Sequence, residues 1–412
     1  MGLPHPDPAS PGPSPQPPAT ILHSEASPGW GGQEHRILAE MTALRARGHR
    51  LLLAARPDSG ILPRAEQAGF TVFPLAFRHR FELASISGLR AVIRRKGVDV
   101  VNAHSAIDGW IAALATRAPG SGLGQVAVVR TRHLSIAVGR DPCTRWVYSR
   151  GCDAVVTTGE ALRQRLIDHN RMDGRRIMSV PTGVDLSRFD PSAVDGRALR
   201  VSLRPLCPDL ADDEPLVGTV AMLRHMKGHH VLVEAMPAIL RVHPKLRFVF
   251  VGEIPHGQSP IRDRILARAQ ELGVANRLIL AGYRDDIPTV LAGLAAVVLP
   301  SIKDEGVPQG LTQALAMARP CVSTTVGAIG EVIRDGDTGW LVPPGDAPAL
   351  AAAVAAIFSD PGEALGRAKR GQALIGRAYS TAAMADGMER VFSRVIAARR
   401  TRAPLILSGS AG

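Results

Sequence analysis

The segment SIKDEGVPQGLTQALA, residues 301–316, places an acidic and an amide side chain around the expected start of a helix. Proline is common at the first helical position, where a missing N–H costs nothing, so we expect this helix to begin at Pro308. Glu305 then lies in the loop that faces the positive end of the helix, and Gln313 lies in its second turn. Considered alone, Glu305 would more often compensate the helix dipole, and Gln313 would more often bond to backbone, than take part in catalysis.

A second candidate site combines two cations with a helix N-terminus. The segment VGTVAMLRHMKGHHVLVEA runs from an apolar strand into a loop with Arg224 and Lys227, and a helix is expected near Gly228. Cations beside the unpaired N–H groups of a helix start form an anion site, for which a diphosphate is the best fit. Further along, LILAGYRDDIPTVL places Tyr283 and Arg284 in a tight loop, which a simple turn with an Asp N-cap would explain equally well.

The pattern around these loops predicts the elements that position them. From Thr20 onward, short apolar runs alternate with stretches of helical period, which is typical of a parallel sheet covered on both faces. The polar, proline-punctuated segment 190–215 interrupts this alternation, which then resumes. We therefore expect an α/β protein of two doubly wound domains with a boundary near residue 205. Ligands of such sheets bind at the carboxyl ends of the strands, so the cleft between the domains is the default site.

Composition limits the class of protein. At 412 residues, of which 45% are hydrophobic and 21% charged, the chain can bury two cores. The net charge of +12 arises mainly in the first 200 residues, but aromatics are only 4% and no recognition helix is evident, so nucleic acid is disfavoured. A solvated arginine-rich surface and docking on an anionic membrane face both stay open. Four cysteines without metal-ligand spacing fit buried thiols in a reducing compartment.

The ends of the chain and its longest apolar runs bear on localisation. The first twenty residues hold eight prolines and no apolar run, which predicts a disordered tail over residues 1–19 and not a signal peptide. The longest apolar stretches, such as residues 290–300, are too short to span a bilayer. We therefore expect a soluble cytoplasmic protein that contacts a membrane only peripherally, if at all.

Taken together, the motifs resemble the retaining glycosyltransferases of family 4, the group 1 glycosyltransferases, which have the GT-B fold. The resemblance covers about residues 21–400. Its signature is the strand end Pro300–Ser301, then Glu305, seven residues, and a second acidic position that is Gln313 here. The other matching segments are MLRHMKGHHVLVEA, AGYRDDIPTVLAGLAAVVLPS, GAIGEVIRDGDTGWLVPPGD, GWGGQEHRILAEMTALRARGH and VPTGVDLSRF.

The resemblance implies a domain organisation. Two Rossmann-like domains would face one another across a cleft, with an acceptor-binding domain over residues 20–204 and a nucleotide-sugar-binding domain over residues 205–378. A C-terminal helix over residues 379–400 would return to the first domain, and residues 401–412 would form a flexible tail.

The resemblance also implies roles for the residues that match. Glu305 would bind hydroxyls of the donor sugar, and Gln313 would occupy the ribose-binding position. Arg224 and Lys227 would neutralise the diphosphate in place of a metal ion, so neither a metal nor a cofactor is implied. His104, in VVNAHSAIDGW, matches the active-site histidine near the reacting sugar, although a lone histidine at a strand end is more often structural.

The remaining matches concern the two ends of the donor. Tyr283 and Arg284 would border the nucleobase, largely through backbone groups. The loop amides of Val307, Gln309 and Gly310 would hold the donor. Two further glycines would let the first loop approach phosphate or acceptor closely, which a plain turn would explain nearly as well, namely Gly31 and Gly32.

The implied reaction is transfer, with retention, from a UDP, GDP or ADP sugar to an envelope glycan or lipid-linked saccharide of the lipopolysaccharide type. Bond cleavage builds negative charge on the leaving diphosphate, so preorganised cations and a helix N-terminus lower the barrier. Glu305 would position and stabilise, and the acceptor would attack from the face that the diphosphate leaves. The sequence does not identify the sugar, the acceptor or the linkage.

Three positions depart from the family pattern. Met222 stands where a basic residue is usual, Gln313 replaces the second Glu, and Pro308 replaces a glycine whose amide helps to clasp the donor. A neutral amide should hold ribose hydroxyls less strongly than a carboxylate. Two alternatives follow: a catalytically silent relative that binds or assembles in an envelope-glycan pathway, and a nucleotide-sugar epimerase. The retained Glu305 and Lys227 argue against the first, and the family motifs argue against the second.

Overall fold

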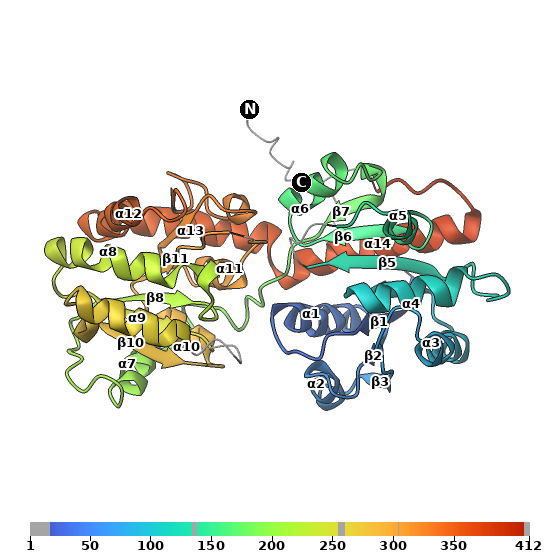
Figure 1. Ribbon diagram of the computed structural model, residues 1–412, viewed down its shortest axis with the longest axis horizontal. Coiled ribbons are helices and arrows are strands. Elements are labelled where there is room, and N and C mark those ends of the chain that lie inside the picture. The colour runs from blue at the N-terminus through green and yellow to red at the C-terminus, as the bar shows by residue number, and fades with distance from the viewer. Residues whose placement is uncertain (1–16, 134–137, 254–259, 304, 408–412) are drawn as a thin grey trace. The chain divides into compact units, whose positions relative to one another are not determined.

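The computed structural model describes residues 17–133, 138–253, 260–303 and 305–407 (Figure 1). The chain divides into an N-terminal unit, residues 1–183 with 381–412, and a C-terminal unit, residues 184–380. Residues 1–16 of the predicted N-terminal tail lie outside the described residues.

The N-terminal unit is built on a parallel sheet of seven strands in the order β3-β2-β1-β4-β5-β6-β7. The strand order reverses between β1 and β4, which makes the carboxyl ends of these two strands the topological switch point. The strands are β1 (Thr20–Glu25), β2 (Arg50–Ala55), β3 (Thr71–Pro74), β4 (Val100–Ala103), β5 (Ala127–Arg132), β6 (Ala154–Thr157) and β7 (Ile177–Ser179).

Helices cover both faces of this sheet and form two apolar cores. One core holds α1 (Gly32–Ala46), α2 (Ile61–Gln67) and α14 (Thr381–Thr401), which packs against α1 and β5. The other holds α3 (Leu83–Lys96), α4 (Ala106–Arg117), α5 (Pro142–Ser149) and α6 (Glu160–Asp168).

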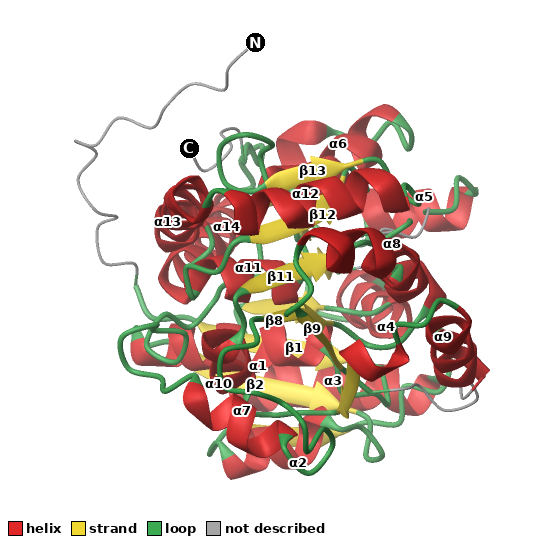
Figure 2. Cartoon of the chain, turned by 90° about the vertical axis from the view of Figure 1, so that its left-hand side faces the viewer, coloured by secondary structure: helices red, strands yellow, loops and turns green. Residues whose placement is uncertain are grey.

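The C-terminal unit has a six-stranded parallel sheet in the order β10-β9-β8-β11-β12-β13. Figure 2 faces this unit and shows its strands between two layers of helices. The strands are β8 (Leu216–Val220), β9 (Arg247–Val251), β10 (Leu278–Gly282), β11 (Ala296–Leu299), β12 (Cys321–Thr324) and β13 (Trp340–Val342). One layer is α8 (His229–Val242), α9 (Pro260–Glu271) and α12 (Ala347–Ser359); the other is α7 (Arg197–Leu203), α10 (Ile287–Gly293), α11 (Gln309–Ala316) and α13 (Pro361–Ala378).

Burial explains why these strands read as continuous apolar runs. All four residues of β11, the sequence AVVL, are buried, because helices cover both faces of a parallel sheet. A strand with one solvated face would alternate instead. The repeated strand and helix pattern of the sequence therefore predicted the class of fold correctly.

The division between the units lies at Gly183 and Val184, earlier than the boundary predicted near residue 205. The intervening segment belongs to the C-terminal unit, because Leu199 and Leu203 of α7 are buried in its core. Gly196 lies so close to α10 that an added Cβ would be 2.4 Å from the Ala292 carbonyl oxygen. Because most residues of this segment are polar, the sequence did not indicate that its few apolar residues are buried in the C-terminal unit.

The predicted flexible tail over residues 401–412 also needs correction in its described part. Leu407 is 2% exposed and lies in the core with α1 and α14. Its backbone N–H donates to the Arg175 carbonyl oxygen at 2.7 Å. Two leucines in the sequence PLIL were enough to hold this end on the N-terminal unit. In the described residues, no helix is both long and apolar enough to cross a bilayer.

Candidate active site

Two loops meet at the carboxyl edge of the C-terminal sheet. β8 and β11 are adjacent parallel strands, so the loops that follow them leave the sheet at the same edge. Lys227 follows β8 and Glu305 follows β11, and Lys227 Nζ is 2.6 Å from Glu305 Oε1. The Ser301 hydroxyl donates to the same oxygen at 2.5 Å. The structure thus joins two predicted site residues that lie 78 positions apart in the sequence.

Glycines allow these loops to approach so closely. Gly228 has φ +72°, and an added Cβ would lie 1.8 Å from the carbonyl oxygen of Pro300. Gly327 has φ +57°, and its Cβ would lie 2.0 Å from the carbonyl oxygen of Glu305. A side chain at either position would meet both left-handed strain and a backbone clash. The Ile302 N–H also donates to the Met226 carbonyl oxygen at 2.8 Å, which fixes one loop on the other.

Several polar groups at this edge have unused capacity among the described residues. Glu305 is 5% exposed, and its Oε2 has no partner there. Lys227 is 21% exposed and uses one of its three N–H groups. The side chain of Arg224 is exposed and makes no hydrogen bond or ion pair within the described chain. The backbone N–H groups of Val307 and Gly310 have no acceptor in the same part. These donors could hold an anion.

The start of α11 differs by one residue from the prediction. Pro308 precedes the helix with φ −72° and ψ 125°, and Gln309 is the first helical residue. The Pro308 carbonyl oxygen accepts the N–H groups of Leu311 and Thr312 at 3.1 and 3.2 Å. Pro308 thus serves as the N-cap residue, and the loss of its N–H still costs no helical hydrogen bond.

The other predicted donor residues of this unit differ in how they are engaged. Tyr283 follows β10, two strands away from β8, and is 62% exposed. The Arg284 guanidinium is held by Asp286, at 2.7 and 2.5 Å, and by the Ser202 hydroxyl at 2.8 Å. Three of its five guanidinium N–H groups are thus engaged, so the backbone and two N–H groups remain for a ligand. The Gln313 side chain is half-buried and bonds to none of the described residues, which leaves its amide available.

In the N-terminal unit, His104 follows β4 and is the middle member of a chain of three histidines. Its Nε2 is 2.9 Å from His23 Nδ1, and its Nδ1 is 3.0 Å from His133 Nε2. His23 and His104 are buried, and His133 is half-buried. Because each neutral ring has one N–H and one acceptor nitrogen, the three rings can bond in one continuous direction.

Burial keeps this chain neutral. It lowers the pKa of His23 to about 3, with a further contribution from the positive charge of Arg36. The pKa values of His104 and His133 also lie well below the ordinary value, with burial as the largest cause. Beyond His23, the Glu40 carboxyl has a pKa raised to about 7 by burial, although Arg36 opposes the shift. In the described part, His23 Nε2 and Glu40 Oε2 are buried without hydrogen-bond partners, although Glu40 Oε2 lies 3.6 Å from Arg36 Nε.

Asp108 fixes the backbone at His104 through hydrogen bonds. Its Oδ2 accepts the backbone N–H of His104 at 2.9 Å and the Ser24 hydroxyl at 3.0 Å, while Oδ1 accepts the Ser105 N–H at 2.9 Å. Burial raises the pKa of Asp108 to about 8, and the nearby Glu25 adds to the shift. The loop between β4 and α4 is therefore fixed where the histidine chain passes.

The glycine-rich first loop lies next to Glu25, the last residue of β1. Glu25 accepts hydrogen bonds from Gln33 in the first turn of α1 and from Ser105. Gly31 has an extended backbone with φ −160°, and its N–H donates to Glu34 Oε2 at 2.8 Å. An added Cβ at Gly31 would make only ordinary contacts, so the turn itself does not require glycine there. Gly32 is exposed at the start of α1.

Sequence reasoning missed His23, His133, Asp108 and Glu25. His23, Glu25 and His133 were visible as polar residues within or directly after a strand run, in ILHSE and RTRH, and Asp108 as an acid in the first turn of a helix, in NAHSAID. Their partnership depends on the order β1-β4-β5, which local pattern does not give. Within the ranges that the structure describes, no group of three or more His, Cys, Asp or Glu is placed to hold a metal ion.

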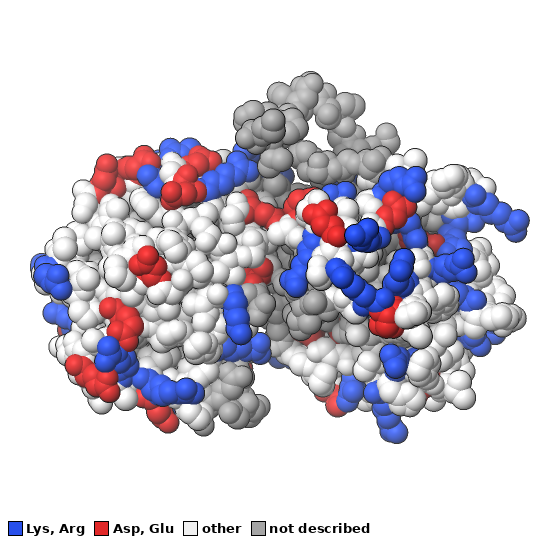
Figure 3. All heavy atoms as spheres, turned by 45° about the horizontal axis from the view of Figure 1, so that its top comes forward, with Lys and Arg blue, Asp and Glu red and all other residues white. Residues whose placement is uncertain are grey.

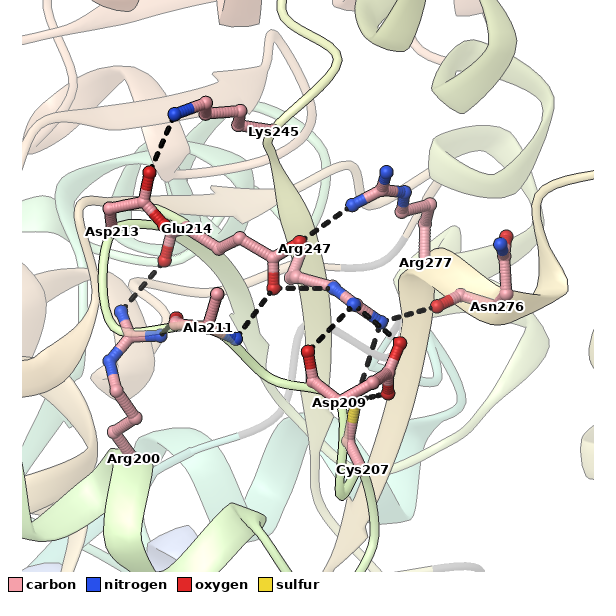
Figure 4. Close-up of polar contacts among 10 residues, drawn as sticks. All are labelled: Arg200, Cys207, Asp209, Ala211, Asp213, Glu214, Lys245, Arg247, Asn276 and Arg277. Atoms are coloured by element: carbon pink, nitrogen blue, oxygen red, sulfur yellow. Dashed lines mark hydrogen bonds and ion pairs between the residues drawn. The ribbon is translucent and has the colours of Figure 1, made fainter.

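A different polar cluster lies at the amino edge of the C-terminal sheet (Figure 4). Arg247, the first residue of β9, is 5% exposed and pairs with Glu214 at 2.9 Å and Asp209 at 2.8 Å. It also donates to the Asn276 carbonyl oxygen at 2.6 Å and to Cys207 Sγ at 3.3 Å. Arg247 lowers the pKa of Asp209 to about 2. This cluster ties the segment before β8 to the sheet.

The chain matches known families over most of its length. Residues 214–360 match the family described as Glycosyl transferases group 1, and residues 30–188 match Glycosyltransferase Family 4. The lipopolysaccharide core biosynthesis glycosyltransferase LpsE of Rhizobium meliloti is 28% identical over 59% of this chain and 65% of that protein. The lipopolysaccharide core biosynthesis mannosyltransferase LpcC of Rhizobium leguminosarum is 29% identical over 53% of this chain and 57% of that protein. The chain thus spans less than two thirds of both relatives.

Solved structures share the fold. A glycosyltransferase from Rickettsia africae superposes with a TM-score of 0.82 at 19% identity, covering 92% of this chain and 99% of that one. Anabaena Alr3699/HepE, solved in complex with UDP, gives a TM-score of 0.77 at 19% identity, with coverage of 91% and 99%. At these identities the likeness concerns the fold alone, and it confirms the predicted GT-B fold of two Rossmann-like units.

Proposed function

Because the chain belongs to the group 1 glycosyltransferases of family 4, we propose that it is a retaining enzyme that transfers a sugar from a nucleotide-sugar donor to a saccharide acceptor. The observation that carries this proposal is the Lys227–Glu305 pair, with the unpaired Arg224 close by in sequence, at the carboxyl edge of the C-terminal sheet. Unused cationic donors and a half-used carboxylate at one strand edge suit a ligand with both phosphates and hydroxyls.

In this proposal the C-terminal unit binds the donor. When the anomeric bond breaks, negative charge grows on the diphosphate, and Lys227, Arg224 and the amides at the start of α11 stabilise it more strongly than in the ground state. The two cations supply the charge that a divalent ion supplies elsewhere, so we propose a metal-independent reaction without a cofactor. Glu305 Oε1 holds Lys227 in place, which leaves Oε2 for a sugar hydroxyl.

The donor's nucleoside end falls to the remaining residues. Gln313 binds the ribose hydroxyls as a neutral amide, and the backbone around Tyr283 and Arg284 borders the base. The structure of Anabaena Alr3699/HepE with UDP supports a nucleoside diphosphate as the ligand class. The acceptor oxygen attacks the anomeric carbon on the face that the diphosphate leaves. The C–O bond to the diphosphate breaks, and the leaving oxygen takes the acceptor's proton.

The N-terminal unit binds the acceptor in this proposal. The neutral His104 is held by Asp108 and by two other histidines, and because both of its ring nitrogens are engaged, it borders the acceptor site without adding charge there. The names of the two Rhizobium relatives support an envelope glycan or lipid-linked saccharide as the acceptor. Peripheral contact with the cytoplasmic face of a membrane stays a prediction.

A ligand screen tests the proposal. UDP, GDP and ADP sugars are added to the full chain and its thermal unfolding is followed. One nucleotide class should raise the melting temperature in the wild type and in Lys245→Ala, but not in Lys227→Ala. Lys245 is the matched control because it is exposed and pairs with Asp213 at the opposite edge of the same sheet.

The screen and a transfer assay together separate the alternatives. Transfer with retention, read by NMR of the product's anomeric proton, supports the enzyme. Binding of a nucleotide sugar without transfer to any envelope saccharide would favour the catalytically silent relative. No stabilisation by any nucleotide sugar contradicts the proposed donor site.

A further inference from the structure

A cavity of about 260 Å³ opens in the N-terminal unit beside the starts of β6 and β7. It is bounded by α5, by the end of α6 and by the loop that follows α6. The arginines in its wall are Arg140, Arg145, Arg171 and Arg176. A second hollow of about 550 Å³ shares Asp153, Asp173 and Arg176 with the first and extends to residues 398–406, at the end of α14 and beyond it. We call the two together the arginine groove.

The arginine groove has more positive charge than its own acids neutralise. Its cations are Arg140, Arg145, Arg171, Arg175, Arg176, Arg399 and Arg402, and its acids are Asp153 and Asp173. Both acids are already engaged: Asp153 pairs with Arg117 and Arg399, and Asp173 pairs with Arg175. Figure 3 shows basic side chains gathering on the face of the N-terminal unit where α5 and α6 lie.

The side chains of three of the arginines make no hydrogen bond or ion pair within the described residues. They are Arg145, Arg171 and Arg402. The rest of the wall is fixed by hydrogen bonds: Arg140 donates to the His169 carbonyl oxygen at 2.5 Å, and Arg176 donates to the Asp153 carbonyl oxygen at 2.8 Å. The arginine groove therefore combines arginines that are fixed by hydrogen bonds with guanidinium groups that have no partner in the described residues.

Backbone strain sets two of these arginines apart. Arg171 has φ 52° and Arg402 has φ 57°, in the left-handed region where glycine or asparagine is preferred. Only two other non-glycine residues of the described chain have positive φ, namely Phe77 and Ala318. Such strain is found more often at functional positions than elsewhere. Glycine would relieve it, so the side chains at these two positions point to a use.

The arginine groove is separate from the residues proposed to act in transfer. Asp153 directly precedes β6 and Arg176 directly precedes β7, so these residues mark the amino ends of the strands. His104 and His133 follow strands, at the opposite edge of the same sheet. A ligand in the groove therefore occupies its own site, and the inference does not depend on the proposed function.

We propose that the arginine groove binds the phosphate groups of an anionic ligand, either a phosphorylated saccharide or a phospholipid headgroup. The planar guanidinium fork pairs with two phosphate oxygens at once, which suits phosphate better than an isolated ammonium does. The concave shape and the braced wall distinguish this site from a diffuse basic surface.

The test uses the full chain with Arg224→Ala and Lys227→Ala, which silence the proposed donor site. Inorganic pyrophosphate is titrated calorimetrically into this background, and sedimentation is measured with phosphatidylcholine vesicles with and without phosphatidylglycerol. Arg145→Gln with Arg171→Asn removes two groove charges, and asparagine keeps the left-handed backbone accessible. The control, Arg95→Gln with Arg150→Gln, removes the same charge from exposed arginines outside the groove.

The groove variant should weaken binding of at least one probe by 10-fold or more, while the control stays within about 2-fold of the background. A selective loss for pyrophosphate indicates a soluble phosphate ligand, and a selective loss for vesicles alone indicates a headgroup. Equal losses in the two variants, or no binding of either probe by the background protein, would overturn the proposal. If the double variant unfolds, Arg145→Gln alone is compared with Arg150→Gln on the same criteria.

Discussion

Each edge of the C-terminal sheet holds a cation beside a carboxylate. The cation uses most of its hydrogen-bonding groups at the amino edge and, among the described residues, only one of them at the carboxyl edge. At the amino edge, Arg247 is almost fully buried and spreads its N–H groups over Asp209, Glu214, Cys207 and a carbonyl oxygen. At the carboxyl edge, Lys227 shares one carboxylate oxygen with a hydroxyl and keeps two N–H groups unused within the described residues.

This difference separates charges that hold the fold from charges that await a ligand. A buried ion pair contributes to a fold only when the remaining hydrogen-bonding capacity is also satisfied, as it is around Arg247. Hydrogen-bonding groups that have no partner within the protein add little to its stability. They are, however, already positioned to bind an anion or hydroxyl groups. Three predictions test this distinction and a fourth tests a buried group of the N-terminal unit; they are given from the largest expected effect to the smallest.

The largest effect should come from Arg247→Ala. Removal of Arg247 takes one donor from each of Glu214, Asp209 and the Asn276 carbonyl oxygen, and it should lower the free energy of unfolding by about 3–5 kcal/mol. Denaturant unfolding of the full chain measures this change. Lys245→Ala, at an exposed pair of the same edge, should stay within about 0.5 kcal/mol of the wild type. A loss under about 1 kcal/mol for Arg247→Ala would show that the cluster does not hold this edge together.

At the carboxyl edge, Lys227→Ala and Glu305→Ala should act on turnover instead. Each removes one preorganised group, so each should reduce turnover on the order of 10²-fold or more. The free energy of unfolding should fall less than in Arg247→Ala, because Lys227 is 21% exposed and the Ser301 hydroxyl still donates to Glu305 in its absence. Steady-state kinetics with the donor identified by the ligand screen decides this. Near-normal turnover in either variant removes that residue from the site.

The N-terminal unit offers a pH test of a buried group. The pKa of His23 is about 3 in the folded chain and 6.5 without burial, so between these values the unfolded chain binds a proton that the folded chain does not. The stability from neutral His23 is complete above pH 6.5 and is lost as the pH falls toward 3. In His23→Gln, the free energy of unfolding should therefore fall less steeply over this window, by up to about 1.4 kcal/mol per pH unit.

Tryptophan fluorescence at pH 5 and pH 7 measures the effect of His23→Gln, because Trp30, Trp110 and Trp146 all lie in the N-terminal unit. His79→Gln serves as the control, since His79 is exposed in the same unit. If His23→Gln and His79→Gln have the pH dependence of the wild type, the buried histidine is not the titrating group.

The smallest effect should come from Pro308→Gly. The variant restores an amide donor before α11 and loosens the loop, with less than about 1 kcal/mol of backbone entropy at stake. The preference among donor sugars that share one nucleotide should change, while affinity for the free nucleotide stays within about threefold. Competition assays and calorimetry measure the two quantities. A large loss of nucleotide affinity with unchanged sugar preference would place Pro308 away from the sugar.

The sequence predicted the class of fold and most of the candidate residues because both depend on local pattern. Apolar runs and helical periodicity can be recognised from short stretches of sequence, and Glu305 and Lys227 each lie within a short motif. Their direct bond could not be read in the same way, because it depends on β8 and β11 being neighbours although β9 and β10 lie between them in the sequence.

Long-range partnership also explains what sequence reasoning missed. His23 lies in β1 and His133 directly follows β5, and they acquire a role only through the order β1-β4-β5. Arg284 looked available in its loop, yet Asp286 and Ser202 occupy its guanidinium. The boundary between the two units was predicted too late in the chain. The segment around the predicted boundary is mostly polar, but four of its apolar residues are buried in the core of the C-terminal unit, namely Leu199, Leu203, Cys207 and Leu210.

The comparison of the two sheet edges is tested most directly by the preference for a nucleoside diphosphate over the corresponding monophosphate. Calorimetric titration of both into the wild type, Lys227→Met and Lys245→Met gives this ratio without knowledge of the sugar or the acceptor. The ratio should fall by at least about 10-fold in Lys227→Met, equivalent to about 1.4 kcal/mol, and stay unchanged in Lys245→Met. An unchanged ratio in Lys227→Met would contradict the assignment of the carboxyl edge to the diphosphate.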